Sequence, residues 1–385
     1  MSTPPIIFKS KLPKTGTSIF AHMSAMAQKY NAINLSQGFP DFDPNPKLME
    51  LVTKALKNGY NQYAPMPGLP ALRTAIAEKV RKLYECNVDA DEMITVTSGG
   101  TEALYAAITA VVHEGDEVIV FEPAYDSYVP AIRLNGGLPI AISLDYPSFG
   151  INWEMVKARI TANTRLIILN TPHNPTGSIL HAEDMEELQR ITQNSDILIL
   201  SDEVYEHIIF DRQEHQSILR YPKLLERSFV VFSFGKSYHA TGWKMGYCIA
   251  PSRLSAEFRK VHQFIVFSSP TPFQHAFAEF LQDEEEYLKL SEFYQAKRDY
   301  FNGLLAESRF TIRPSAGTYF QLAGYEAISD MGDMAFSEWL TREAGVATIP
   351  VSVFYSNRED HHLIRFCFAK SEKLLEKAAD KLIRL

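Results

Sequence analysis

The sequence predicts an α/β protein with a large, mostly parallel seven-stranded sheet sandwiched by helices, together with a smaller α+β domain. Short apolar runs alternate with helix-like segments from about residue 48, which is typical of parallel strands buried on both faces. From about residue 277 the pattern changes to one long charged helical stretch, followed by alternating segments. A chain of 385 residues is also too long for one compact core.

Seven apolar runs are expected to form the large sheet, at 93–97, 117–121, 138–143, 165–170, 196–201, 228–233 and 245–250. Helices are expected between some of them, at 101–112, 125–134 and 182–192. The smaller domain should contain a helical stretch, three strands and a closing helix, at 284–307, 310–313, 318–322, 363–368 and from 372 onward. Residues up to about 45 look irregular. We therefore expect three parts: an N-terminal segment packing with the small domain (1–45), a large domain (46–280) and a small C-terminal domain (281–385).

Composition excludes several classes of protein. The chain is 46% hydrophobic and 22% charged, as in ordinary soluble proteins. Its net charge of -8 leaves no Lys/Arg excess to neutralise nucleic-acid phosphates. Three scattered cysteines, Cys86, Cys248 and Cys367, are too few for a disulfide framework or a zinc cluster, and we expect no bound metal.

The N-terminus and the hydropathy pattern predict a cytoplasmic protein. Residues 1–10 lack the charged start and long apolar stretch of a signal peptide. No segment approaches the roughly 18 apolar residues of a membrane helix. We therefore expect no membrane attachment.

Lys236 and Asp202 carry the strongest chemical signal. Each follows an apolar run that is expected to be a strand, and ligands of such sheets bind at the carboxyl ends of the strands. An amine and a carboxylate placed in this way suit pyridoxal phosphate (PLP): the lysine forms a Schiff base, and the carboxylate keeps the pyridine nitrogen protonated so that the ring is an electron sink. The alternative for Asp202 is a helix cap or a surface carboxylate. If Asp202 is buried at a strand end, it needs a cation or a donor, and a pyridinium nitrogen would supply one.

A glycine turn at 98–103 joins a predicted strand to a predicted helix. Its exposed amides and the helix dipole could bind an anion, although such glycines are often only structural. Ser233 and the basic Lys244 strengthen the anion reading. The Gly-Lys-Ser sequence at 235–237 is not a P-loop, because Val230 stands where that motif requires glycine.

Three further polar residues follow predicted strands. Asn174 lies in a turn that two prolines make rigid; the turn is either purely structural or fixes the amide to donate to the ring oxygen of PLP. Tyr205 could reach the same oxygen. Tyr125 could stack on the ring, or it could be a core residue.

Arg365 interrupts the apolar run 363–368. An arginine in such a place is costly unless a carboxylate pairs with it. Two readings remain open: an internal salt bridge, or a bidentate clamp for a substrate α-carboxylate.

At these residues the chain resembles the class I and II aminotransferases of PLP fold type I, over essentially its whole length. The resemblance rests on four motifs in one order, Asn-Pro-Thr-Gly at 174–177, Ser-Asp-Glu-Val-Tyr at 201–205, Ser-Phe-Gly-Lys at 233–236 and Gly-Trp-Lys-Met-Gly at 242–246. Gln-Gly-Phe-Pro-Asp at 37–41 and Asn-Gln-Tyr-Ala-Pro at 61–65 are most similar to the kynurenine–glutamine and bacterial methionine aminotransferase branch. Lys244 fits that branch, since aspartate aminotransferases have arginine there.

The resemblance implies a role for each site residue. Lys236 would be the catalytic Schiff-base lysine, and Asp202 the partner of the pyridine nitrogen. The remaining cofactor contacts would come from Asn174 and Tyr205 at the ring oxygen, Tyr125 on the ring, and Gly100, Thr101, Ser233 and Lys244 at the phosphate. Tyr63 would reach the phosphate of the neighbouring subunit, which implies a homodimer. The substrate's amino-acid head would contact Gly38, Asn174 and Arg365.

The implied reaction is transfer of the amino group of an apolar, sulfur-containing or aromatic L-amino acid, of methionine, glutamine, phenylalanine or kynurenine type, to a 2-oxo acid. The aromatic candidates for the pocket are Phe20, Phe39, Tyr63, Tyr125 and Phe267. One alternative on the same scaffold is a carbon–sulfur β-lyase acting on cysteine S-conjugates or cystathionine, which releases a thiol and pyruvate without an oxo-acid acceptor. A more distant alternative is a non-enzymatic PLP-binding regulatory module, for which the chain lacks an added DNA-binding segment.

Overall fold

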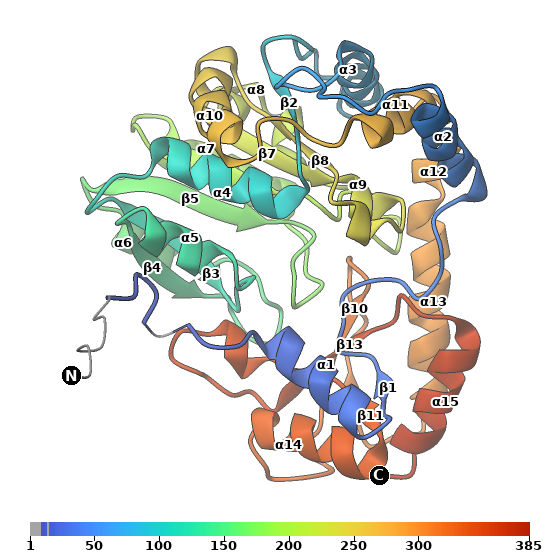
Figure 1. Ribbon diagram of the computed structural model, residues 1–385. Coiled ribbons are helices and arrows are strands. Elements are labelled where there is room, and N and C mark those ends of the chain that lie inside the picture. Colours follow the sequence, from blue (N-terminus) through green and yellow to red (C-terminus); the bar gives the residue numbers. More distant parts are fainter. Residues whose placement is uncertain (1–8, 14) are drawn as a thin grey trace, which may run out of the picture.

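A seven-stranded sheet forms the centre of the large domain in the computed structural model, which describes residues 9–13 and 15–385. Its strands run in the order β2 (Ile94–Thr97), β8 (Gly246–Ile249), β7 (Ser228–Ser233), β6 (Leu198–Asp202), β5 (Thr164–Asn170), β3 (Glu117–Glu122) and β4 (Leu138–Ser143). Only β8 is antiparallel to its neighbours (Figure 1). The predicted mostly parallel, seven-stranded sheet is confirmed.

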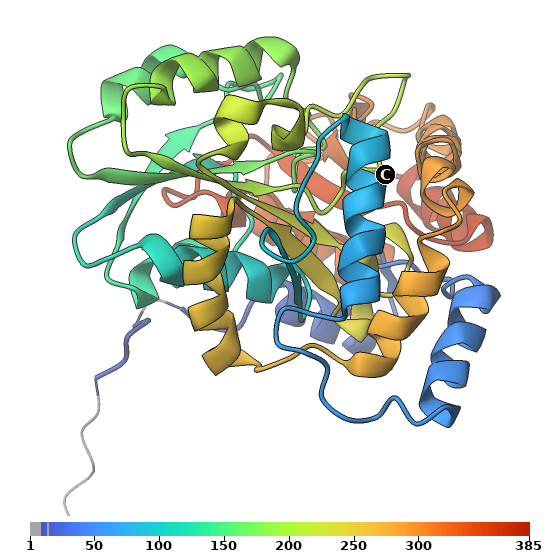
Figure 2. The ribbon, with the colours of Figure 1, turned by 90° about the horizontal axis from the view of Figure 1, so that it is seen from above.

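Helices lie on both sides of this sheet (Figure 2). One face packs against α3 (Pro70–Tyr84) and α7 (Ala182–Thr192), and the other against α4 (Gly100–Val111), α5 (Tyr128–Leu134) and α10 (Ser252–Ile265). Successive strand residues alternate between the two cores: Ile167 belongs to the first and Leu166 to the second. Because both faces are buried, the strands read as continuous apolar runs.

Shorter elements complete the large domain. They are α2 (Pro46–Lys57), α6 (Trp153–Arg159), α8 (Pro222–Leu225), α9 (Phe234–Ser237), α11 (Thr271–Phe280) and the 3₁₀ turns Ile218–Arg220 and Thr241–Trp243. The one-turn helix α9 follows β7 directly and contains Lys236. Because no loop separates strand and helix, this lysine stays at the carboxyl edge of the sheet.

The C-terminal part has its own four-stranded sheet, in the order β12 (Ile349–Pro350), β13 (Leu363–Cys367), β10 (Phe320–Gly324) and β9 (Thr311–Ile312). Its helices are α12 (Glu285–Leu288), α13 (Leu290–Leu304), α14 (Asp333–Trp339) and α15 (Glu372–Leu382), with a π-helical turn at Leu340–Ala344 and a 3₁₀ turn at Ser352–Phe354. This is the predicted α+β pattern. The helical stretch expected at 284–307 is divided into α12 and α13 at Lys289.

The expectation of irregular structure up to residue 45 is wrong in part. Helix α1 (Ile19–Lys29) begins where the Ser18 side chain accepts a hydrogen bond from the Ala21 amide, and it buries Met23 and Ala27. Strand β1 (Ile33–Asn34) follows and pairs in parallel with β11 (Val346–Ala347). A cap of this kind stabilises a helix. Because α1 buries only two side chains, its sequence shows little of the helical spacing of apolar residues from which a helix is predicted.

The division into parts at 1–45, 46–280 and 281–385 remains a prediction, supported by the pairing of β1 with the C-terminal β11. Residues 1–8, which bear on the expectation about a signal peptide, lie outside the described residues. Among the helices that the structure does describe, none is both long and apolar enough to cross a membrane.

Candidate active site

The carboxyl ends of four strands surround one cavity. Asn170 ends β5 and Asp202 ends β6, and the two are paired in the sheet register; Ser233 ends β7, and Gly99 follows β2. The cavity has a volume of about 150 Å³. Nine of the predicted site residues line it: Gly100, Thr101, Tyr125, Asn174, Asp202, Tyr205, Ser233, Lys236 and Lys244.

Asp202 is buried, with 3% of its surface exposed. Burial raises the pKa of Asp202 to about 6, although hydrogen bonds from Tyr128 Oη at 2.6 Å and from the Val204 amide favour the ionised form. Asp202 therefore does not sit on the surface as a solvated carboxylate. A cationic or proton-donating ligand beside it would shift it to the charged form.

Lys236 extends from α9 into the cavity. Burial lowers its pKa to about 8, and the charges of Lys244 and Arg365 act in the same direction. Its Nζ lies 3.0 Å from Tyr319 Oη and 3.3 Å from the carbonyl oxygen of Gly38. An amine with a pKa near 8 is partly neutral at physiological pH and can act as a nucleophile or base.

The opposite side of the cavity has the features of an anion cradle. Helix α4 begins at Gly100, and its N-cap, Gly99, has a φ of 83°, a conformation that favours glycine. A Cβ on Gly99 would lie 3.4 Å from Lys244 Nζ, so the lysine ammonium is held close to the helix N-terminus. Lys244 itself adopts a left-handed conformation with a φ of 52°, which is uncommon for a non-glycine residue. An ammonium and a helix dipole both favour an anion, so this part of the cavity could hold a phosphate.

Arg365 lies beside the cavity, with 1% of its surface exposed. Its Nη1 donates to Asn174 Oδ1 at 2.6 Å, its Nη2 donates to the Ser36 carbonyl at 3.2 Å, and its Nε has no hydrogen-bond partner among the residues that the structure describes. Within residues 9–13 and 15–385, no carboxylate forms a salt bridge with it. The structure therefore does not support an internal salt bridge for Arg365. Its guanidinium keeps N–H groups that could donate to a bound carboxylate.

Two of the predicted site residues lie elsewhere. Gly38 does not line the cavity, but its carbonyl oxygen contacts Lys236. Tyr63 is 81% exposed, and its ring meets that of Phe267 edge-on at 5.1 Å. Tyr63 thus has no contact with the cavity of its own chain.

The sequence reasoning missed two buried tyrosines, Tyr128 beside Asp202 and Tyr319 beside Lys236. Tyr128 lies in the first turn of α5 and has 3% of its surface exposed. Neither residue follows the carboxyl end of a predicted strand, so the sequence does not distinguish either of them from the other aromatic core residues.

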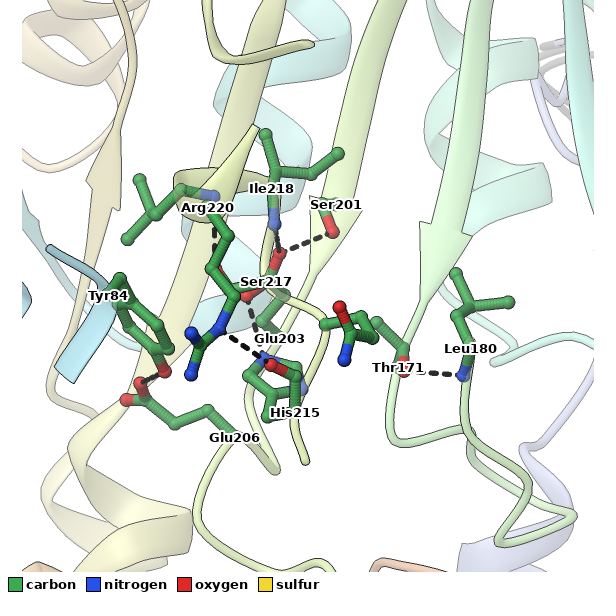
Figure 3. A network of polar contacts seen from close by, with 12 residues as sticks. Tyr84, Thr171, Leu180, Ser201, Glu203, Glu206, His215, Ser217, Ile218 and Arg220 are labelled. Atoms are coloured by element: carbon green, nitrogen blue, oxygen red, sulfur yellow. Dashed lines mark hydrogen bonds and ion pairs between the residues drawn. The ribbon is translucent and has the colours of Figure 1, made fainter. Parts of the chain in front are cut away.

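A polar network behind the sheet edge anchors the segment that carries Asp202 and Tyr205. In Figure 3, Glu203 accepts hydrogen bonds from Ser201 Oγ at 2.8 Å and from the Ile218 amide at 3.0 Å, and its Oε2 lies 2.9 Å from His215 Nε2. Glu203 is completely buried. These contacts fix the backbone immediately after Asp202 from the side opposite the cavity.

Glu206 fixes the same segment one turn further on. It accepts a hydrogen bond from Tyr84 Oη at 2.5 Å (Figure 3) and forms a buried ion pair with Lys79. Burial alone would raise the pKa of Glu206, but the charges of Lys79 and His207 outweigh it and hold this pKa below its ordinary value. The segment therefore carries cavity residues on one side and a buried charge network on the other.

Residues 30–382 match the family model "aminotransferase class I and II". The chain belongs to this family. The family's cofactor is pyridoxal 5′-phosphate, and the side chains present fit it: a buried lysine amine, a buried carboxylate, and a glycine-lined helix N-terminus beside a second lysine. This aminotransferase is therefore PLP-dependent.

Two Escherichia coli matches are similar to this chain in sequence or fold over essentially their whole lengths. The chain is 53% identical to methionine aminotransferase of Escherichia coli over the full length of both chains. A crystal structure of an Escherichia coli protein with methionine aminotransferase function, also 53% identical, superimposes with a TM-score of 0.97 and covers 99% of this chain and 100% of that one.

Two further relatives are more distant. Human kynurenine–oxoglutarate transaminase 1 is 32% identical, with 93% of each chain covered. The structure of N-succinyldiaminopimelate aminotransferase from Mycobacterium tuberculosis is 35% identical, with a TM-score of 0.94 and coverage of 98% of this chain and 100% of that one.

The buried pair behind the site yields a stability prediction. Glu206→Ala should lower the free energy of unfolding by about 3–5 kcal/mol, because it leaves Lys79 buried without its counter-charge. Urea denaturation measures this loss. The exposed pair Lys54–Glu279, at 3.2 Å, provides the control: Glu279→Ala should cost less than about 1 kcal/mol. Equal effects of the two substitutions would contradict the structural role of the buried network.

Proposed function

We propose that this aminotransferase transfers the amino group of an apolar, sulfur-containing or aromatic L-amino acid, with methionine as the leading candidate, to a 2-oxo acid. The observation that carries the proposal is the single cavity in which Lys236, Asp202, Asn174 and Lys244 meet, in a chain 53% identical to a methionine aminotransferase. The named relatives are aminotransferases, and this favours transamination over β-elimination.

Lys236 is the proposed catalytic residue. When bound, the cofactor supplies an electron sink for the negative charge that forms at the substrate α-carbon. Nζ of Lys236 would hold the cofactor and, when free, would take the α-proton as a general base and return it. With a pKa of about 8, roughly one tenth of such amines are neutral at pH 7, so the base form is accessible.

The other cavity residues bind and orient the cofactor in this proposal. Asp202 would hold a proton on the pyridine nitrogen, and Asn174 and Tyr205 would donate to the ring oxygen. Tyr125 would stack on the ring. The phosphate contacts come from the cradle on the opposite side, made by Gly100, Thr101, Ser233 and Lys244.

Arg365 binds the substrate α-carboxylate in this proposal. Its Nε has no partner in the described part of the chain, and its guanidinium carbon lies 3.8 Å from the ring centroid of Phe320 and 5.4 Å from that of Phe20. The aromatic walls exclude water and strengthen a carboxylate–guanidinium contact. Gly38 and Asn174 complete the binding of the amino-acid head.

Among the described residues of a single subunit, no arginine lines the cavity, and Arg365 lies beside it. Among the described residues, the cationic side chains that line it are Lys236 and Lys244, which are assigned to the cofactor. A dicarboxylic substrate such as aspartate would therefore bury its distal carboxylate without a partner. This supports an apolar or aromatic side chain.

The substrate assignment is tested by steady-state kinetics across methionine, phenylalanine, kynurenine and aspartate with several 2-oxo acids. We expect kcat/KM for methionine to exceed that for aspartate by at least about 100-fold, because a site with no second cation leaves a carboxylate unpaired. A preference for aspartate would overturn the assignment. Release of a thiol and pyruvate from a cysteine S-conjugate without an oxo acid would instead reveal the lyase.

We further propose that the active unit is a homodimer in which Tyr63 reaches the phosphate in the neighbouring subunit. Tyr63 is 81% exposed and its ring contacts that of the half-exposed Phe267, while Phe264, three residues before Phe267, is 84% exposed. Exposed aromatic side chains that gather in this way mark an interaction surface. A second copy of the chain is the proposed occupant.

Active-site complementation tests the shared site. Lys236→Ala and Tyr63→Ala subunits should each have low activity, but a hybrid dimer contains one site with both an intact Lys236 and a partner's intact Tyr63. Co-expression should therefore give more activity than the sum of the separate variants, up to about one quarter of the wild-type activity for random pairing. Strictly additive activity in purified hybrids would show that Tyr63 does not act across an interface.

A further inference from the structure

Tyr319 joins three parts of the chain at the proposed catalytic lysine. It directly precedes β10 in the C-terminal part and is completely buried. Its Oη lies 3.0 Å from Lys236 Nζ and 2.6 Å from the carbonyl oxygen of Gly38. Since Nζ also contacts that carbonyl at 3.3 Å, the three groups form a closed triangle.

The single hydroxyl proton of Tyr319 decides which group donates and which accepts in each of these hydrogen bonds. A tyrosine hydroxyl has one proton to donate and lone pairs with which to accept. Burial, together with the neighbouring Tyr205, raises the pKa of Tyr319 well above its ordinary value, so the hydroxyl keeps its proton. It donates that proton to the Gly38 carbonyl and therefore accepts from the Lys236 amine.

We infer that Tyr319 is a positioning residue for transamination, a role that rests on the function proposed above for Lys236. Its hydroxyl holds the lysine amine during the part of the cycle in which that amine is not bonded to the cofactor. Lysine has a flexible four-carbon stem with many rotamers. Two fixed acceptors, on Tyr319 and Gly38, keep Nζ at the cavity, where it must take the α-proton and return it.

The ring of Tyr319 has a separate packing role that phenylalanine could fulfil. It contacts the rings of Tyr205 at 5.2 Å and Phe320 at 4.9 Å. The adjacent Tyr294, at 5.7 Å, is also completely buried, yet its hydroxyl has no hydrogen-bond partner in the part of the chain that the structure describes. Packing in this aromatic cluster therefore does not by itself aim a hydroxyl at a partner, and Tyr294 is a matched control.

The first experiment compares Tyr319→Phe with Tyr294→Phe in the holoenzyme. Both substitutions remove one buried hydroxyl and keep the ring. We expect Tyr319→Phe to lower kcat with methionine roughly 10-fold, to leave KM within about two-fold, and to increase the isotope effect with α-deuterated methionine, because proton transfer by a poorly held base becomes slower. Tyr294→Phe should match the wild type in all three.

The second readout is the acidity of the lysine amine. An acceptor bond favours the protonated amine, so loss of the Tyr319 hydroxyl should lower further a pKa that burial already lowers to about 8. When the cofactor carries the amino group, Lys236 Nζ is not bonded to it and can be labelled, so the holoenzyme is prepared in that form. Competitive acetylation across pH, with mass spectrometry of the Lys236 peptide, should show a midpoint lower by about half a pH unit or more in Tyr319→Phe, and no shift in Tyr294→Phe.

The outcomes separate this inference from the proposal on which it rests. If Lys236→Ala keeps its turnover, the proposed function of Lys236 fails, whatever Tyr319→Phe does. If Lys236→Ala is inactive but Tyr319→Phe behaves like Tyr294→Phe, only the role of Tyr319 is overturned. A lower kcat with an unchanged acetylation midpoint also overturns it, because the hydroxyl would then act through packing alone.

Discussion

Two opposite ionisable groups, the amine of Lys236 and the carboxylate of Asp202, are buried around one cavity at the carboxyl edge of a parallel sheet. Burial moves both toward their neutral forms, with the pKa of Asp202 raised to about 6 and that of Lys236 lowered to about 8. Such an arrangement is expensive in a protein that serves no chemistry. It suits a cofactor whose ring nitrogen needs an anion and whose aldehyde needs an amine.

The rest of the fold holds these two groups in place. Parallel β5, β6 and β7 bring their carboxyl ends to one edge, and in-register pairing places Asn170 beside Asp202. Behind that edge, Glu203 and Glu206 fix the segment between Asp202 and Tyr205 with hydrogen bonds and a buried ion pair. This edge of the sheet is therefore supported by polar residues, Glu203 and Glu206, that do not line the cavity, as a precise site requires.

Arg365 connects this edge to the C-terminal part. It lies on β13, paired with β10 and β12, and reaches Asn174 of the large domain at 2.6 Å. Tyr319, at the start of β10, reaches Lys236 in the same way. In the proposed function, substrate binding by Arg365 and proton transfer by Lys236 would therefore depend on contacts between the two parts of the chain.

Much of this architecture could be predicted from sequence because burial on both faces makes parallel strands nearly continuous apolar runs. The seven expected strands agree with the structure to within about two residues at each end, and candidate site residues at or just after strand ends, such as Asp202 and Lys236, can be proposed from their position. Helix α1 escaped prediction because only two of its side chains are fully buried. Tyr128 and Tyr319 escaped because their importance lies in a hydroxyl directed at a residue far away in the sequence, which no local pattern encodes.

The central claim is that Lys236 Nζ is the atom that holds pyridoxal phosphate. Borohydride reduction of the holoprotein, followed by proteolysis and mass spectrometry, tests it most directly. The account predicts a single phosphopyridoxyl group, on the peptide that contains Lys236. A label on Lys244 or on any other lysine, with the Lys236 peptide unmodified, would contradict it.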